Sequence, residues 1–356
     1  MTIVAHSRPF VVGVDTHARN HVYAILAPAT GELLDTGEFP TTKAGINRAL
    51  AWAGRRIGGD AETLWVIEGA ATYGAVLTGA VTAQGYEVAE AARTSAGDRR
   101  GLGKSDALDA HRIAVAVLPL REKQLRRPRL GDGLRQALRV LVSARETMTD
   151  ERTRMVNTLT ALLRANDLGI DARRSLTGIQ ITEVSRWRSR EEDLALSVAR
   201  AEAIRLAQHI IELDDALTAN LAQIKELVEV SEAAPLLTEK GFGPVTAAIC
   251  LTTWSHPGRV RSEAAFASLA GVNPIPASSG NTIRYRLNRG GDRRLNKALH
   301  MVSINRMTHD AQTRAYVEKR VAQGRTIKEI RRCLKRYLAR RVYRTLNAQT
   351  QAPITT

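Results

Sequence analysis

The sequence predicts an α/β N-terminal region, a helical connector and a mainly helical, basic C-terminal region. Three observations carry this prediction. Strand-like apolar runs alternate with helical patterns over residues 11–89. Apolar residues then recur at spacings of three and four over two long stretches, which is typical of amphipathic helices. Residues 281–345 finally hold 19 Lys and Arg against four Asp and Glu, so most of the positive charge lies at the C-terminal end.

The N-terminal elements alternate in the order of an RNase H-like α/β domain. Three strands are expected first, two within Val11–Ala27 around a turn at Thr16–Asn20 and a third over Gly31–Phe39. A helix, a strand, a helix, a strand and a helix should follow, over Lys43–Arg56, Thr63–Glu68, about Tyr73–Gln84, Tyr86–Ala89 and Ser105 to about Val117. In open α/β sheets, function lies at the carboxyl ends of the central strands, so catalytic groups are expected there.

Two long helical stretches form the expected connector. They cover Leu134–Ala165 and about Arg190–Val230, after a basic segment bracketed by Pro119 and Pro128. The second stretch has an apolar face that needs a partner. That partner is either the preceding helix in an antiparallel hairpin or the same helix of another subunit. Trp187, between two arginines, is either a packing residue or a base-stacking residue.

The composition favours a polyanionic partner. The chain has 356 residues and a formal net charge of +16, and its hydrophobic content of 44% is sufficient for real cores. No apolar stretch approaches the roughly 20 residues that span a bilayer, and residues 1–9 lack the apolar core of a signal peptide. Cys250 and Cys333 show no metal-ligand spacing, so neither a zinc site nor a disulfide framework is expected. We therefore expect a cytoplasmic protein that binds nucleic acid and no membrane.

Four acidic residues occupy positions where this fold would place catalytic groups. Asp15 ends the apolar run 10–14, and Glu68 ends the run 64–67. Asp106 and Asp109 lie three residues apart in a predicted helix and so project from one face. Together they would form an oxygen ligand set of the kind that suits Mg²⁺, which accepts substrate phosphates as further ligands. Two such ions can flank a scissile phosphate, so the sequence predicts an enzyme that cuts or exchanges nucleic-acid strands.

Two C-terminal segments are candidate phosphate contacts. Residues 236–246 are expected to form a helix, a turn at Gly241 and Gly243, and a second helix, so that backbone amides approach a phosphate; a plain helix-capping glycine is the equal alternative. A Ser-Ser-Gly loop at 278–280 precedes clustered cations that would hold a phosphate. These cations are Arg284, Arg286, Arg289, Arg293, Arg294 and Lys297. Lys104 either contacts a phosphate or is an ordinary exposed lysine. The basic helical region 295–344 either offers its polar face to phosphates or is a solvated basic face.

The motifs match a known family. Gly13-Val14-Asp15-Thr16-His17 and Lys104-Ser105-Asp106-Ala107-Leu108-Asp109 resemble the RuvC-like DEDD domain of the insertion sequence 110 family of transposases, which includes the Piv-type DNA invertases. The stretch Pro274–Gly280 is similar to the transposase domain that forms the second half of that family. The resemblance implies a RuvC-like catalytic domain at 10–120, a coiled-coil connector at 130–230 and a transposase domain at 231–346, with a helix-hairpin-helix-like segment.

The resemblance also implies a chemistry and partners. Ser279 would be the covalent nucleophile, with Ser278 as the adjacent alternative, and the four acids would bind Mg²⁺ or Mn²⁺. Donor and target DNA would be the substrates, and a non-coding bridge RNA would supply sequence specificity by base pairing. The family acts as multimers, so a homo-oligomer, dimer or tetramer, is expected at the bacterial nucleoid. His17 and His111 either line the acidic site or are structural.

Two other functions fit the same residues. A metal-dependent nuclease of Holliday-junction type would use water instead of the serine, and would still cut after Ser279→Ala. An inactive element copy would only bind nucleic acid, and Asp15→Asn would change nothing in it.

Overall fold

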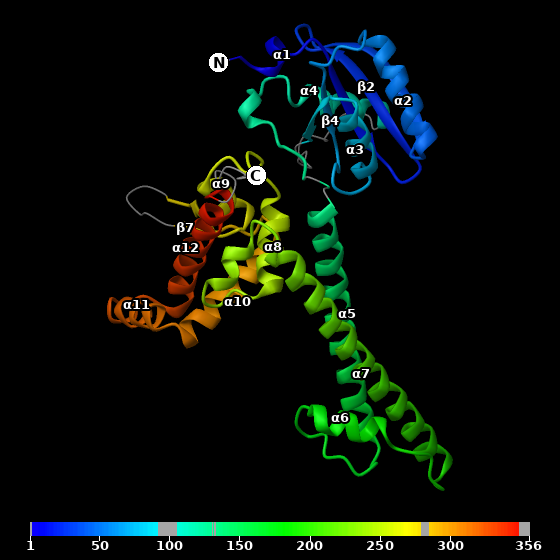
Figure 1. Cartoon of the computed structure of the whole chain (residues 1–356), viewed down its shortest axis with the longest axis vertical. Helices are drawn as coiled ribbons and strands as arrows, with labels where there is room; N and C mark the ends of the chain where they lie inside the picture. The colour runs from blue at the N-terminus through cyan, green and yellow to red at the C-terminus, as the bar shows by residue number, and fades with distance from the viewer. Residues whose placement is uncertain (1, 92–104, 130, 132, 279–284, 349–356) are drawn as a thin grey trace. The chain divides into compact units, whose positions relative to one another are not determined.

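The computed structural model describes residues 2–91, 105–129, 131, 133–278 and 285–348. Lys104, Ser279 and Arg284 lie outside these described residues. The chain divides into two compact units. Unit 1 comprises Met1–Gly131 and Ser255–Arg261, and unit 2 comprises Asp132–Trp254 and Ser262–Thr356. Figure 1 shows a sheet with helices in the first unit and helices almost throughout the second, which confirms the predicted mixture of α/β and α structure.

The sheet of unit 1 has five strands in the order β3-β2-β1-β4-β5. They are β1 (Val11–Thr16), β2 (Asn20–Ala27), β3 (Glu32–Pro40), β4 (Leu64–Ile67) and β5 (Glu87–Glu90). The first three form an antiparallel meander, whereas β4 pairs parallel with both β1 and β5. The described helices of this unit are α1 (Val4–Ser7), α2 (Lys43–Arg56), α3 (Ala75–Ala83), α4 (Asp106–Val115) and the 3₁₀ helix η2 (Glu122–Gln124). From β1 to α4 the elements follow one another along the chain as predicted from the sequence, whereas α1 and η2 were not predicted. The arrangement is compatible with an RNase H-like domain.

Helices cover both faces of the sheet because the central strands are apolar on both sides. One face packs Val12, Val14 and Trp65 against side chains of α2 and α3. The other face packs Val11 and Val66 against residues of α4. The sheet is therefore the middle of three layers, and α4 lies directly on β1.

The close approach of α4 to β1 depends on a glycine. A Cβ atom at Gly13 would lie 2.2 Å from the carbonyl oxygen of Ala110 and 2.7 Å from the amide nitrogen of Ala114. No side chain fits at that distance from a helix backbone. Gly13 thus sets the depth at which α4 crosses the strand that ends at Asp15.

Unit 2 begins with a long helical hairpin. It consists of α5 (Gly133–Ala165) and α7 (Leu194–Glu229), with the short helix α6 (Gly178–Ser185) between them in the chain. The hairpin is antiparallel: the side-chain amide of Asn220 donates to the backbone carbonyl of Leu141 at 3.0 Å, and His209 Nε2 lies 2.9 Å from Glu151 Oε1. The preceding helix of the same chain therefore packs against α7, the first of the two partners considered, but Leu194, Val198 and Leu221 of the predicted apolar face remain exposed.

The tip of the hairpin has its own core. Apolar residues of α5, α6 and α7 pack there, among them Leu159, Val184 and Leu206. Arg200, only 3% exposed, pairs with Glu192 and places its guanidinium carbon 4.9 Å from the centre of the Trp187 ring. Trp187 is thus a packing residue in this structure, and it forms a cation–π contact with Arg200.

The rest of unit 2 is mainly helical. Its elements are η3 (Ala234–Thr238), α8 (Pro244–Trp254), α9 (Glu263–Leu269), β6 (Pro274–Pro276), β7 (Tyr285–Leu287), α10 (Arg293–His309), α11 (Ala311–Ala322) and α12 (Ile327–Ala348). The helix predicted before the Gly-x-Gly turn is a five-residue 3₁₀ helix with Pro235 close to its start. Proline at the start and glycine close behind leave too short a span for an α-helix.

Candidate metal centre

The centre is built at the edge of the sheet where β1 and β4 end. Val14 pairs with Ile67 in parallel register, and the amide of Glu68 donates to the carbonyl of Val14 at 3.0 Å. The hydroxyl of Thr16 donates to the carbonyl of Glu68 at 2.8 Å and joins the two strand ends. Asp15 and Glu68 therefore lie at one edge, as the carboxyl ends of parallel neighbours must.

The first turn of α4 supplies two further carboxylates. Ser105 caps this helix by accepting from the amide of Leu108 at 3.3 Å, and Asp106 and Asp109 follow within the turn. Carboxylates are stabilised there by the helix dipole. Since α4 lies on β1 at Gly13, this turn comes to the same edge as Asp15.

His17 joins the two elements. Its Nε2 atom lies 3.1 Å from Asp15 Oδ2 and 3.8 Å from Asp106 Oδ2. The three side chains each offer a ligand atom, and these atoms lie within 4.8 Å of one another. Of the two roles considered for His17, the structure supports lining the acidic site. Its position two residues after Asp15, across the turn from β1 to β2, was the available signal.

Burial and like charge both act on Asp15. The residue is only 7% exposed, and burial is the main reason that its pKa is raised. His17 opposes this rise in the pKa, while the charges of Asp109 and Asp106 add to it. A carboxylate that is desolvated and faces other carboxylates is stabilised by a cation. The donor set, two carboxylates and an imidazole, is one that can hold a divalent metal ion.

Two predicted ligands are placed less directly. Asp109 forms an ion pair with Arg112 at 3.0 Å, one turn along α4, although its charge still acts on Asp15. Glu68 has an exposed side chain and lies outside the group of three ligand atoms. The structure therefore brings Asp15 and Asp106 together, and leaves Glu68 and Asp109 at the border of the site.

The comparisons with known proteins agree with this architecture. Residues 12–166 match a model of the insertion sequence 110 DEDD type, described as a transposase, and residues 233–318 match the model described as transposase IS116/IS110/IS902 family. The chain belongs to the insertion sequence 110 family of transposases. It is 26% identical to the insertion element IS900 uncharacterized 42 kDa protein of Mycobacterium paratuberculosis, over 90% of this chain and 91% of the relative. It is 24% identical to the IS116 uncharacterized 44.8 kDa protein of Streptomyces clavuligerus, over 88% of each chain.

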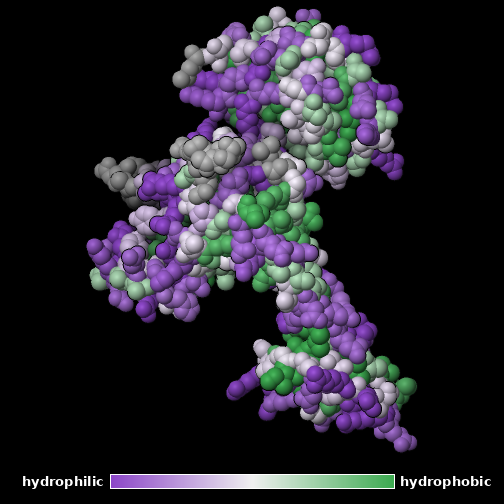
Figure 2. Space-filling model, in the orientation of Figure 1, coloured by the Kyte–Doolittle hydropathy of each residue, from purple (hydrophilic) through white to green (hydrophobic). Residues whose placement is uncertain are grey.

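Apart from Lys104, the predicted nucleic-acid contacts of this transposase lie in unit 2. Arg286, Arg289, Arg293 and Lys297 are exposed. Arg294 is also exposed, but it pairs with Glu146 of α5 at 2.6 Å. The face of α11 and α12 seen in Figure 2 is mostly hydrophilic, as a nucleic-acid surface requires.

The Gly-x-Gly turn is used largely within the protein. Gly241 has a φ of +86°, and a Cβ there would lie 3.1 Å from the side chain of Arg306, so the turn packs on α10. The amide of Gly243 donates to the hydroxyl of Thr246 at 2.9 Å. That amide is therefore already bonded, contrary to the expectation that it approaches a phosphate.

Part of the basic face of α12 is also neutralised internally. Glu263 pairs with Arg340 at 3.1 Å and with Arg344 at 2.5 Å, and Glu239 pairs with Arg341. These two acids were not singled out in the sequence, because they lie far from α12 along the chain. Not every arginine of this helix is thus available to phosphates.

Among the described helices, none is both long and apolar enough to cross a bilayer.

Proposed function

We propose that this transposase cuts and exchanges DNA strands at the metal centre around Asp15, with Ser279 as the covalent nucleophile. The observation that carries the proposal is the convergence of Asp15, His17 and Asp106 from the end of a buried strand and the start of α4. Such an edge can hold divalent cations against a nucleic-acid phosphate. Membership of a transposase family supplies DNA as the substrate class.

The chain's own residues divide the work. Asp15 and Asp106 would hold the metal, which when bound stabilises the charge that develops on the scissile phosphate. His17 would orient the carboxylate of Asp15 through the contact of its Nε2 atom at 3.1 Å, and it lies 3.8 Å from the carboxylate of Asp106. Glu68 and Asp109 would complete the ligand set when the phosphate is in place, as their positions at the border of the site support.

The covalent step is a transesterification. The hydroxyl oxygen of Ser279 forms a bond to phosphorus, and the bond from phosphorus to one deoxyribose oxygen breaks. The serine proton passes to solvent or a base, and the leaving oxygen takes up a proton. Attack by a hydroxyl of the second DNA strand then breaks the serine–phosphorus bond. The phosphodiester energy is conserved, so no ATP is needed. Ser279 carries this role by resemblance to the family.

Guidance and assembly belong to the same proposal. The exposed cations of residues 286–297 support contacts with nucleic-acid backbones, which position a duplex without reading its sequence. We assign the sequence specificity to a non-coding bridge RNA and the complete reaction to a homo-oligomer acting at the nucleoid, both on the basis of the family resemblance.

Recombination between donor and target plasmids tests this function, with the element's flanking non-coding RNA present. Wild type, Ser279→Ala and Asp15→Asn are compared, and protein–DNA adducts are trapped on a denaturing gel. The expected result is an adduct in wild type and neither adduct nor recombination in the two variants. Ser278→Ala is the matched control, and it should retain the adduct.

A metal-dependent nuclease without serine chemistry is the second candidate. It is favoured by the fact that Asp15, His17 and Asp106 all come from unit 1. Cleavage that persists in Ser279→Ala without an adduct would establish this candidate and reject the serine mechanism. Omitting the RNA from the wild-type reaction separately tests guidance, since recombination should then be lost.

A further inference from the structure

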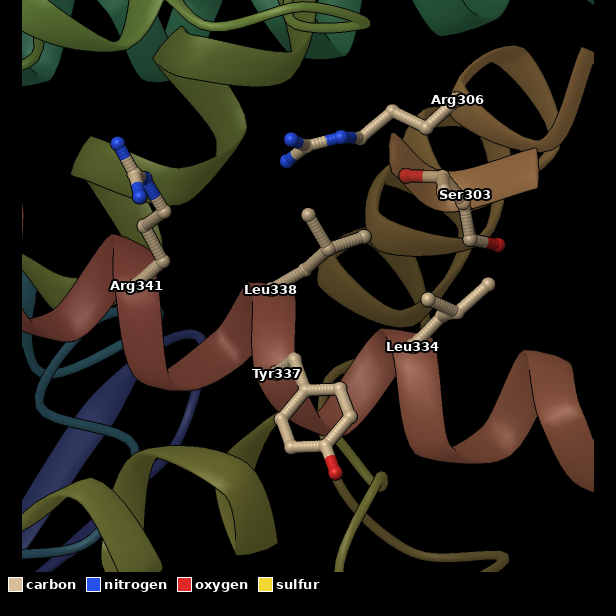
Figure 3. Close-up of a pocket in the computed structure, with 7 residues that line it drawn as sticks. Ser303, Arg306, Leu334, Tyr337, Leu338 and Arg341 are labelled. Carbon is tan, nitrogen blue, oxygen red and sulfur yellow. The ribbon is translucent and has the colours of Figure 1, made fainter. Parts of the chain in front are cut away.

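A cavity of about 160 Å³ lies between α10, α11 and α12, outside the metal centre and the Ser-Ser-Gly loop (Figure 3). Its wall is partly apolar and partly cationic. The lining residues are Ser303, Arg306, Thr313, Leu334, Tyr337, Leu338 and Arg341. Both charged residues of this lining are arginines, whose planar guanidinium groups match the geometry of phosphate oxygens.

Arg306 has donor capacity that the protein does not use. Its Nε atom is buried and has no hydrogen-bond acceptor among the described residues. The carboxylate of Asp310 lies 3.8 Å from this atom, which is beyond hydrogen-bond distance. The same carboxylate instead accepts from the amide of Thr313 at 3.1 Å and from its hydroxyl at 2.6 Å. Asp310 is thus committed to capping α11, and Arg306 is left without a close acceptor.

Arg341 reaches the same cavity from the opposite helix. Figure 3 shows the guanidinium group of Arg306 extending above Leu338, with that of Arg341 to one side of this leucine. Glu239 pairs with Arg341, and Asp310 lies 3.8 Å from the Nε atom of Arg306, so each arginine has an acidic neighbour within the protein. An anion between the two groups would add the close hydrogen-bond acceptor that Arg306 Nε lacks among the described residues. Leu334 and Leu338 form an apolar wall beside the two arginines.

The turn at Gly241 holds Arg306 in position. A Cβ atom at Gly241 would lie 3.1 Å from Cγ of Arg306 and 3.2 Å from the carbonyl oxygen of Val302. The turn therefore packs directly on the stem of the arginine, and a larger residue would displace it. A side chain fixed in this way loses little conformational entropy when it binds.

We propose that Arg306 and Arg341 form a binding site for a tetrahedral oxyanion, namely a phosphate group of a nucleic-acid backbone. Ser303 and Tyr337 are among the residues that line the cavity. The cavity accommodates one phosphate group with a few water molecules, given about 30 Å³ for each water. The proposal rests on the proposed function only in taking nucleic acid as the source of the phosphate.

Titration of inorganic phosphate into the full chain, followed by calorimetry at constant ionic strength without divalent metal, tests the site itself. Saturable binding is expected in wild type. Arg306→Gln and Arg341→Gln should each weaken it about tenfold, the effect of losing a charge-assisted hydrogen bond. Arg306→Lys keeps the positive charge and much of the aliphatic stem, so its phosphate affinity should lie between that of the two glutamine variants and that of wild type. Arg314→Gln removes an exposed arginine of α11 outside the cavity, and should bind phosphate like wild type.

A short single-stranded oligonucleotide of mixed sequence distinguishes the source of the phosphate. It should displace inorganic phosphate, and Arg306→Gln should lower the slope of log affinity against log salt by about one. Lost phosphate binding with an unchanged oligonucleotide affinity and slope would overturn the nucleic-acid assignment in favour of a free phosphate. Equal phosphate binding by all four variants and wild type would overturn the site. Asp15→Asn should leave the phosphate and oligonucleotide titrations unchanged. A failure of the proposed strand cleavage can therefore be distinguished from a failure of the proposed phosphate site.

Arg341→Gln guards against a folding artefact. The side chain of Arg341 is 60% exposed, so its replacement should not alter the packing of the three helices. Loss of phosphate binding in this variant, with an unchanged melting temperature, is the expected result. Unchanged binding in Arg341→Gln would remove one of the two arginines from the site and reject the proposal as stated.

Discussion

Replacing Gly13 by alanine should damage the metal centre without touching a ligand. The added Cβ would lie 2.2 Å from the carbonyl oxygen of Ala110 and 2.8 Å from Cβ of Ala114. Ordinary carbon contacts lie near 3.5–4.0 Å, so α4 must move away from β1 by roughly 1 Å or more. The obstructing atoms include helix backbone, which cannot rotate away. Overpacking of this kind costs about 1–3 kcal/mol of folding free energy.

The displacement of α4 should have its largest effect at the metal centre. Asp106 sits at the start of the displaced helix, whereas Asp15 sits on the strand, so the movement separates these carboxylates directly. A misplacement of about 1 Å can cost roughly 10²-fold in rate. Gly13→Ala should therefore melt at a lower temperature, bind Mn²⁺ more weakly in a titration followed by electron paramagnetic resonance, and lose about two orders of magnitude in strand cleavage.

Gly54→Ala is the matched control. Gly54 lies within α2, and a Cβ there meets nothing within 4 Å. Alanine in a helix interior should raise the free energy of unfolding by roughly 0.5–1 kcal/mol and leave metal binding unchanged. A Gly13→Ala protein with wild-type stability and metal affinity would refute the argument, because α4 would then not be held against β1 as described.

Three further outcomes are expected. Asp15→Asn should abolish metal binding yet raise metal-free stability by on the order of 1 kcal/mol near pH 7, as removal of strained functional groups often does. Because the folded-state pKa of Asp15 is raised, the charged form is the unfavourable one, so this gain should disappear as the pH falls below the unfolded pKa. Arg200→Ala should lower the melting temperature of the hairpin tip more than Arg205→Ala does, since Arg200 is buried against Trp187 and pairs with Glu192, whereas the pair of Arg205 and Glu202 is exposed. Glu263→Gln should release two arginines of α12 and steepen the salt dependence of nucleic-acid binding, and an unchanged slope would contradict their neutralisation by this acid.

The local sequence pattern was sufficient to predict the helices and strands and the acidic residues at their ends. The strands around Asp15 and Glu68 were predictable because continuous apolar runs of four to six residues, each ended by a polar residue, match buried strands. The helix that carries Asp106 was predictable from its capping serine and its spacing. These signals depend only on neighbours in the chain, so the sequence by itself determined the meander, the alternation that follows it and the acids at the strand ends.

Tertiary structure decided which of these groups meet. Whether His17 contacts Asp106 depends on how deeply α4 crosses β1, and the contact across Gly13 that sets this depth joins residues about a hundred positions apart. The neutralisation of α12 by Glu263 and the pairing of α7 with α5 are likewise long-range contacts. Local periodicity shows that a face is apolar or charged, but many partners satisfy the same face. The choice among them is made only when the whole chain packs, because close packing admits few arrangements of the backbone.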